Sequence, residues 1–270
     1  MTDFDELIDL PRGRRVRVRA RGEGPTLLWC HGVFFPIEVD DESALGRVLN
    51  EVPGLRVVRL DARGHGRTPA GPDGAAHRWD AMAEDVLDVA TALGARRFAL
   101  GGISMGAAVA LHAALSAPER VEAMLLFALP TAWETRGPEK VRYRELFALG
   151  STEAMVRHVE RDLDALFPDR ARPPALEAMV RAIGRSPWEA LARVIEGAAE
   201  SDMPDRSALA GLDVPVLVRP WPDDSGHPMS SAEALAKALP RGDLSVLASF
   251  DDDPGMRAAF AELGRLLAAR

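Results

Sequence analysis

The sequence predicts an α/β fold with a mostly parallel central sheet flanked by helices and a helical cap inserted before the last strands. Apolar runs that suit buried strands alternate with amphipathic stretches that suit helices, which is typical of a parallel sheet covered on both faces. Between residues 130 and 210 only helical patterning is present, and prolines interrupt it. The prediction therefore divides the chain into a core of residues 1–129 and 211–270 and a cap of residues 130–210.

The elements are predicted in order from the spacing of apolar residues. Residues 14–19 alternate charged and apolar side chains, which indicates an edge strand with one solvated face. Continuous apolar runs predict buried strands at residues 26–30, 56–60, from 97 to the turn at 104, 121–129, 214–218 and 244–248. Amphipathic stretches predict core helices at 43–52, 78–93, 105–115, 231–239 and 254–269, and cap helices at 141–149, 152–166, 175–184 and 187–199.

The composition narrows the class of partner. The chain has 270 residues, and 47% of them are hydrophobic, which is enough for a sizeable core. Its 33 Lys and Arg residues against 41 Asp and Glu residues give a formal net charge of −8. This balance argues against nucleic acid or an anionic membrane surface as the partner. A small-molecule substrate is the expected partner, and a homodimer is left open.

The same inventory predicts a cytoplasmic location. Cys30 is the single cysteine of the sequence, so no internal disulfide can form and a reducing compartment fits. The acidic N-terminus does not show the pattern of a signal peptide. No run of about 18 apolar residues predicts a membrane span. No cofactor and no metal site are expected.

The stretch Gly102-Ile103-Ser104-Met105-Gly106 is the centre of the predicted fold. A strand that turns directly into a helix forces the serine into a strained backbone conformation, and only glycines avoid collisions on either side. The turn presents the Ser104 hydroxyl at a helix N-terminus, where negative charge is stabilised. The alternative interpretation is a Gly-rich turn with a serine that caps the helix.

The chain resembles the α/β-hydrolase superfamily over nearly its full length. Four stretches carry the resemblance: His31-Gly32 after a strand, residues 61–68 (DARGHGRT), Gly102–Gly106, and the strand 214–218 followed by Asp223-Asp224. The resemblance implies that residues 130–210 are the lid over the carboxyl ends of the strands.

The resemblance also implies roles for single residues. Ser104 would be the nucleophile, and the backbone N–H groups of Val33 and Met105 would form the oxyanion hole. The acid would follow the strand 214–218, where Asp224 fits best and Asp223 second.

The catalytic histidine of the superfamily is missing from its usual place after the last strand. The loop at residues 248–256 contains no histidine, and none occurs after position 227. A serine hydroxyl is a poor nucleophile without a positioned base. His227, three residues after Asp224, is the leading substitute base. The alternative is that His227-Pro228 only opens the next helix.

The other histidines and the acidic loop have simpler interpretations. His31 and His65 are expected to shape loops, with a role as base as the alternative, and His77 starts a helix. His112 points away from the proposed chemistry, and His158 lies on a cap helix, on its solvated face or else lining the pocket. The run Asp251-Asp252-Asp253 is expected to form a solvated turn that places negative charge at the N-terminus of the final helix. The alternative is a carboxylate that faces the pocket, where it binds a cationic group or acts as a base.

A substrate pocket is expected between cap and sheet. Its predicted lining residues are His31, Phe34, Trp133 and Trp221, and such walls suit a mainly apolar small molecule. The alternative for the aromatic residues is that they fill the core under the cap.

Three functions agree with this sequence. The first is a serine hydrolase acting on a small, largely apolar ester, lactone or thioester through Ser104, Asp224 and His227. The second is a non-hydrolytic enzyme on the same scaffold, such as a cyclase, lyase or decarboxylase of secondary metabolism. The third is a catalytically inactive ligand-binding protein. Fold alone does not decide between them.

Overall fold

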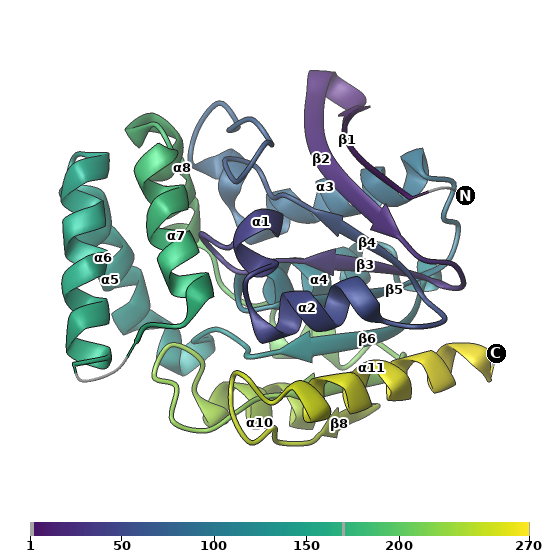
Figure 1. Cartoon of the computed structure of the whole chain (residues 1–270). Coiled ribbons are helices and arrows are strands. Elements are labelled where there is room, and N and C mark those ends of the chain that lie inside the picture. Colours follow the sequence, from purple (N-terminus) through teal and green to yellow (C-terminus); the bar gives the residue numbers. More distant parts are fainter. Residues whose placement is uncertain (1–2, 169–170, 270) are drawn as a thin grey trace.

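One mostly parallel sheet organises the molecule (Figure 1). The computed structural model describes residues 3–168 and 171–269, so the ends of the predicted core and residues 169–170 of the predicted cap lie outside it. The described strands are β1 (Phe4–Leu10), β2 (Arg14–Arg21), β3 (Thr26–Cys30), β4 (Arg56–Leu60), β5 (Phe98–Ile103), β6 (Val121–Phe127), β7 (Val216–Arg219) and β8 (Gly242–Leu244). Their order across the sheet is β1-β2-β4-β3-β5-β6-β7-β8. The pairs β1–β2 and β2–β4 are antiparallel, and all pairs from β4 to β8 are parallel.

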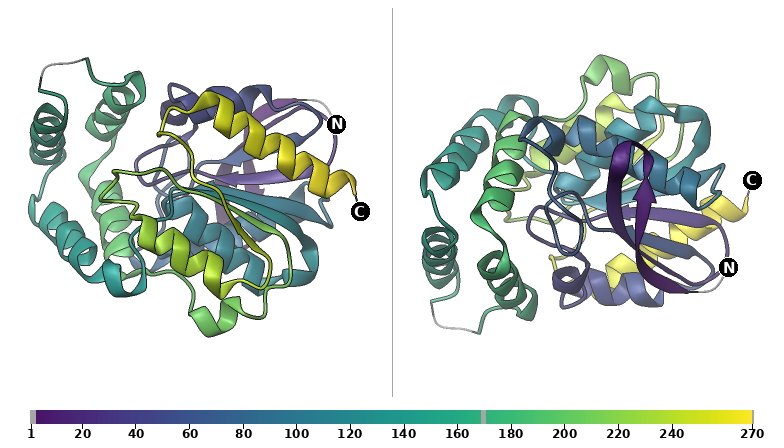
Figure 2. Two further views of the ribbon diagram at one scale, coloured as in Figure 1. Left: turned by 90° about the horizontal axis from the view of Figure 1, so that it is seen from below. Right: turned by 90° about the horizontal axis from the view of Figure 1, so that it is seen from above.

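Helices cover both faces of the sheet. The helices of the core are α1 (Ile37–Asp40), α2 (Ala44–Glu51), α3 (Trp79–Ala92), α4 (Met105–Ser116), α9 (Arg206–Leu209), α10 (Met229–Ala238) and α11 (Asp253–Ala268). Short 3₁₀ turns occupy Pro11–Gly13, Ala75–His77, Pro118–Arg120 and Trp133–Thr135. Helices α2 and α11 pack on one face, and α3, α4 and α10 pack on the other (Figure 2). No helix in the described part of the chain is both long and apolar enough to cross a membrane.

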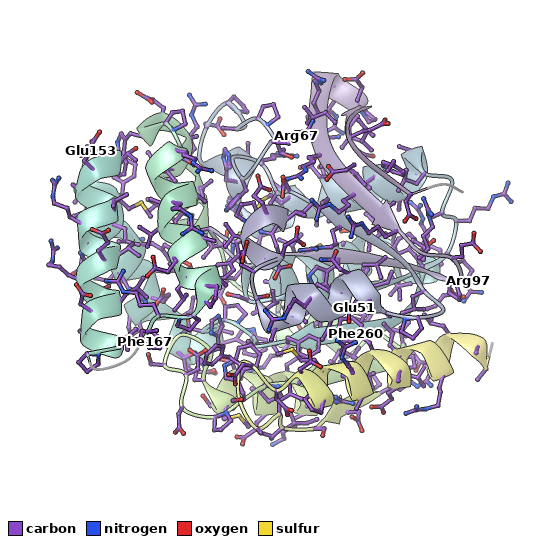
Figure 3. All side chains as sticks on the ribbon, in the orientation of Figure 1. Glu51, Arg67, Arg97, Glu153, Phe167 and Phe260 are labelled. Atoms are coloured by element: carbon purple, nitrogen blue, oxygen red, sulfur yellow. The ribbon has the colours of Figure 1, made fainter. Side chains whose placement is uncertain are left out.

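An aromatic cluster joins α11 to the middle of the sheet. Phe260 lies between this helix and the strands (Figure 3), with its ring centroid 5.7 Å from that of Trp29 and 5.8 Å from that of Phe127. Tilted aromatic pairs at such distances add to the stabilisation that comes from burying their area. The cluster packs α11 against β3 and β6, which lie on either side of β5, the strand that leads to Ser104.

Four further helices form a layer beyond the carboxyl ends of the parallel strands, at the left of Figure 1. This helical layer consists of α5 (Arg136–Ala148), α6 (Thr152–Leu166), α7 (Pro174–Arg185) and α8 (Trp188–Glu200). It has its own apolar cluster, which includes Tyr143, Met155 and Ile195, and Phe34 of the core packs against that cluster. The layer lies within the segment that the sequence predicts as the cap, at the end of the molecule opposite both chain termini (Figure 1).

The prediction of a solvated edge strand at residues 14–19 is wrong. Strand β2 lies between β1 and β4, and Arg17 is only 6% exposed. Its guanidinium forms ion pairs with Asp5 at 2.8 Å, with Asp61 at 3.2 Å and with Glu38. The arginine in the middle of β2 is therefore buried against acids. The edge strand is β1, whose polar sequence does not show the apolar run of a strand.

The last predicted strand is displaced. Strand β8 covers Gly242–Leu244, whereas the sequence predicts a strand at 244–248. The following residues still pair with the neighbouring segment, because the N–H groups of Ser245 and Leu247 donate to the carbonyls of Val218 and Pro220. The chain after β8 thus stays hydrogen-bonded alongside the end of β7, without the regular pairing of a strand.

The burial of Arg17 leads to a stability prediction. We expect Arg17→Met to lower the free energy of unfolding by about 3 kcal/mol, because it leaves the fully buried carboxylate of Asp61 without its cation. Urea denaturation monitored by circular dichroism measures the change. Arg15→Met on the same strand is the matched control. Its side chain is 54% exposed and pairs with Asp9 at 3.3 Å, so a loss of less than about 1 kcal/mol is expected. An equal loss of unfolding free energy in the two variants would contradict the stabilising role of the buried ion pair between Arg17 and Asp61.

Candidate active site

Ser104 lies in a sharp turn between β5 and α4. Its backbone has φ 54° and ψ −123°, which is a strained conformation for a residue with a side chain. The turn is held because the Ser104 N–H donates to the carbonyl of Ala128 at 3.0 Å, next to the end of β6. The turn places the hydroxyl at the N-terminus of α4, where the helix dipole favours negative charge.

Two glycines make this turn possible. A Cβ atom on Gly106 would lie 2.0 Å from the carbonyl oxygen of Cys30, and one on Gly102 would lie 2.5 Å from the backbone of Gly106. Both distances are far below van der Waals contact. The close approach of these backbones therefore excludes any side chain at either position and fixes where Ser104 stands.

His227 meets Ser104 from a loop two strands away. The loop follows β7, which is separated from β5 by β6. The Nε2 atom of His227 lies 2.8 Å from the hydroxyl oxygen of Ser104, and its Nδ1 atom lies 2.8 Å from Oδ2 of Asp224. For Nε2 to accept the proton of the hydroxyl, Nδ1 must carry the hydrogen and donate it to Asp224. The structure thus brings Ser104, His227 and Asp224 into one line of hydrogen bonds.

The carboxylate of Asp224 is fixed by donors on both oxygens. Its Oδ1 atom accepts the backbone N–H groups of Gly226 and His227, at 3.0 and 3.2 Å. Its Oδ2 atom accepts from His227 and from the indole Nε1–H of Trp221, the latter at 3.1 Å. Burial acts to raise the pKa of this carboxyl, but the hydrogen bond and charge of His227 and the other donors hold the pKa below its usual value. Asp223 is exposed, so Asp224 is the acid that contacts the histidine.

A buried arginine supports the loop that carries these residues. The N–H of Thr131 donates to the carbonyl of Gly226 at 3.2 Å, and the Thr131 hydroxyl accepts from Arg136 at 3.3 Å. Arg136 is 1% exposed, donates to the carbonyls of Ala198 and Ser201 at 2.6 and 3.0 Å, and lies over the ring of Trp79. Sequence reasoning missed this support, because its contacts join segments far apart in the chain.

The loop after β3 lies beside Ser104. A Cβ atom on Gly32 would stand 3.5 Å from the Cβ atom of Ser104. The loop turns tightly, with the N–H of Phe35 donating to the carbonyl of Gly32 at 3.1 Å and Phe34 at a φ of 60°. Within the described ranges, the backbone N–H groups of Val33 and Met105 have no hydrogen-bond acceptor. That leaves them available for a bound oxygen atom, and their predicted role as an oxyanion hole stays a prediction.

His31 is fixed by hydrogen bonds at both ring nitrogens, and its predicted place in the pocket lining stays a prediction. The ring is buried, its Nδ1–H donates to the carbonyl of Gly32 at 2.7 Å, and its Nε2 accepts the N–H of Ala62 at 2.9 Å. Burial lowers the pKa of His31 to about 4, so the ring is neutral at pH 7. The side chain links the loop beside Ser104 to the loop after β4.

Asp61 reinforces the same link. Its Oδ1 accepts the N–H of Ile37 at 2.8 Å, and its Oδ2 accepts the N–H of Arg67 and the guanidinium of Arg17, both at 3.2 Å. The side chain is fully buried. The loops that follow β3 and β4 are therefore held together by His31 and Asp61.

The predicted aromatic pocket residues have three different positions. Phe34, in the loop beside Ser104, packs against the apolar cluster of the helical layer. Trp221 lies beside the proposed site, but its indole donates to Asp224. Trp133 is used elsewhere: its indole donates to the carbonyl of Pro204 at 3.0 Å and lies under Arg206.

The other side chains that the sequence singled out serve the fold. His65 and His77 bond to the carbonyls of Arg63 and Asp73, His112 to that of Asp202, and His158 pairs with Asp162. At the start of α11, the N-cap residue Asp252 accepts the N–H of Gly255, and Asp253, the first residue of the helix, pairs with Arg257. Among the described residues, no group of three or more His, Cys, Asp or Glu side chains could hold a metal ion.

Comparisons with known proteins agree with the fold. A family model described as the alpha/beta hydrolase fold matches residues 25–189. A protein named putative carbamate hydrolase RutD from Klebsiella pneumoniae is 33% identical over 196 residues, which cover 68% of this chain and 70% of that protein. An epoxide hydrolase from Caballeronia sordidicola is 30% identical over 163 residues, 59% of this chain and 47% of its own length, so this chain spans about half of that relative.

Solved structures show the same architecture. A hydrolase from Pseudomonas aeruginosa superposes with a TM-score of 0.79 at 24% identity and covers 97% of this chain and 98% of its own. The enol-lactonase from Burkholderia xenovorans superposes with a TM-score of 0.77 at 20% identity and covers 97% and 100%. At these identities the likeness establishes the fold.

The buried histidines predict how stability depends on pH. Burial lowers the pKa of His31 to about 4 and that of His65 to about 3, against 6.5 for an exposed histidine. Between these values the unfolded chain binds protons that the folded chain does not, so acid favours unfolding. Stability is therefore complete above pH 6.5 and falls on acidification, by up to about 1.4 kcal/mol per pH unit for each histidine.

Urea denaturation at several pH values between 4.5 and 7 measures this slope. We expect His31→Gln to make the slope shallower but not to abolish it, since burial also lowers the pKa of His65 and His77, which remain. His158→Gln is the control for the loss of a histidine, because its side chain is partly exposed on α6 and its removal leaves the buried rings in place. An unchanged slope in His31→Gln would contradict the contribution of the buried His31 ring to the pH dependence of stability.

Proposed function

The chain belongs to the alpha/beta hydrolase fold family, and we propose that it is a serine hydrolase with Ser104 as nucleophile, His227 as base and Asp224 as acid. One observation carries the proposal: the hydroxyl of Ser104, the two ring nitrogens of His227 and the carboxylate of Asp224 form an unbroken chain of hydrogen bonds, each 2.8 Å long. Relatives named as hydrolases support this class of enzyme. The strained turn at Ser104 supports the role of its hydroxyl as nucleophile.

The acylation step uses each group in the position that the geometry supplies. His227 Nε2 takes the hydroxyl proton while Ser104 Oγ bonds to the carbonyl carbon of the substrate. The carbonyl oxygen becomes negative and is stabilised by the N–H groups of Val33 and Met105. The imidazolium then passes its proton to the leaving group, whose bond to carbon breaks and leaves an acyl-serine.

Deacylation repeats the same steps with water. His227 takes a proton from water, the resulting hydroxide bonds to the acyl carbon, and the proton returns to Ser104 Oγ as the carboxylic acid leaves. Asp224 stays ionised throughout and stabilises the imidazolium. Its lowered pKa supports this role, because a protonated carboxyl could not balance the charge of the ring.

The proposed acid and base share one loop, which departs from the usual plan of the family. A histidine after the last strand is missing, and His227 follows Asp224 by three residues. The short spacing works because the backbone N–H of His227 itself bonds to Asp224 Oδ1, so the loop curls around the carboxylate. The ring then projects across β6 to reach Ser104.

The proposed substrate is a small, largely apolar ester, lactone or thioester. Phe34 directly follows Val33, whose N–H is proposed for the oxyanion hole, and packs against the apolar cluster of the helical layer, which favours an apolar substrate. We propose that this layer, with the rest of residues 130–210, is the cap over the substrate. Relatives in structure named as an enol-lactonase and as esterases agree with this substrate class.

Covalent labelling with a fluorophosphonate probe tests the proposal. Wild-type protein should be labelled on Ser104, and Ser104→Ala should not be labelled at all. His227→Ala should slow labelling by roughly 10²–10⁴-fold, because the hydroxyl loses its base. Peptide mapping by mass spectrometry locates the label, and the rate is measured by gel fluorescence over time.

His158→Gln serves as the histidine control and should be labelled at the wild-type rate. Labelling of Ser104 at that same rate in His227→Ala would refute the role of His227. Absence of labelling in the folded wild type would refute the serine hydrolase and favour the non-hydrolytic or ligand-binding alternatives.

A further inference from the structure

Trp221 lies where β7 passes into the loop of Asp224 and His227. The residue is 7% exposed, and its ring belongs to the apolar cluster beneath α11. Its indole Nε1–H donates to Oδ2 of Asp224 at 3.1 Å, and the same oxygen accepts His227 Nδ1–H at 2.8 Å. One carboxylate oxygen therefore serves two ring donors.

The indole is not needed to orient the carboxylate. Oδ1 is already held by the backbone N–H groups of Gly226 and His227, which fixes the plane of the carboxylate within its own loop. Oδ2 then faces His227 whether or not Trp221 is present. The remaining effect of the indole is electrostatic, because a donor on Oδ2 withdraws part of the charge that would otherwise attract the imidazolium.

We propose that Trp221, acting through Asp224, limits how strongly that carboxylate stabilises the protonated ring of His227. The proposal rests on the proposed function for its consequence, which is that His227 gives up its proton more readily and is available as a base at lower pH. A general base works best when its affinity for protons is matched to the working pH. Trp221 would lower the affinity of His227 for a proton through a single N–H group, the indole Nε1–H.

The charged groups of the surrounding elements are engaged elsewhere. Arg219 of β7 pairs with Asp243 and Glu262. Arg136 of α5 donates to backbone carbonyls and to Thr131, and Asp252 before α11 accepts backbone N–H groups. Asp223, in the same loop, is exposed to solvent. Apart from His227 itself, the indole of Trp221 is therefore the group that donates directly to Oδ2 and can change how strongly Asp224 attracts the protonated ring.

The test compares Trp221→Phe with wild type by following the imidazole nitrogens of His227 by ¹⁵N NMR as a function of pH. Removing the indole donor should move the titration midpoint of His227 upward by about half a pH unit or more. The low-pH limb of the rate of fluorophosphonate labelling should shift by the same amount. Trp133→Phe is the matched control, because it also loses one indole hydrogen bond, to the carbonyl of Pro204, and should leave the midpoint unchanged.

An unchanged or lowered midpoint in Trp221→Phe would overturn the proposal, since a ring that only fills space alters stability and not titration. If Trp221→Phe does not fold, the wild-type indole N–H resonance of Trp221 decides: it should shift with the titration of His227 and lose that shift in Asp224→Asn. An indole resonance that changes neither with the titration of His227 nor on Asp224→Asn would overturn the proposal. The NMR readouts need no turnover, so a protein that shows the midpoint shift but no labelling would refute the proposed hydrolase alone.

Discussion

The close approach of Gly106 to the carbonyl of Cys30 is the constraint on which the rest of the site depends. It brings the start of α4 against the end of β3, which restricts the path of the turn from β5 into α4. The strained backbone of Ser104 follows from this path, as does the position of the loop with Gly32 and Val33 beside it. Stability of the core thus supports a strained residue that local sequence preferences would disfavour.

A second set of contacts transmits this constraint to the neighbouring loops. His31 ties its own loop to Ala62, and Asp61 ties the same two loops to Ile37 and to Arg17 of β2. These contacts are buried, so removing one side chain leaves the polar group that it bonded without a partner and destabilises the fold. On the other side, Thr131 holds the carbonyl of Gly226 and so connects the start of the helical segment to the loop of the proposed acid and base.

Much of the fold could be predicted because it depends on local pattern. The apolar run at residues 26–30 and the pattern at 254–269 match β3 and α11 within a residue. The pairing of β1 with β2 could not be predicted, because β1 is polar and is stabilised by arginines from the next strand. For the site, the spacing of Asp224 and His227 suggested their contact. The structural role of His31 depends on a contact with Ala62 from a different loop, and the donor role of Trp221 depends on how the loop after β7 curls. The pattern of apolar residues records neither of these.

The central claim is that His227 removes the proton of Ser104, and chemical rescue tests it most directly. Replacing His227 with alanine leaves a space beside Asp224 that added imidazole can fill. We expect imidazole to restore hydrolysis of a p-nitrophenyl ester by His227→Ala in a saturable way, with no effect on Ser104→Ala. An imidazole dependence that is equal in both variants, or wild-type hydrolysis by His227→Ala without imidazole, would contradict the account.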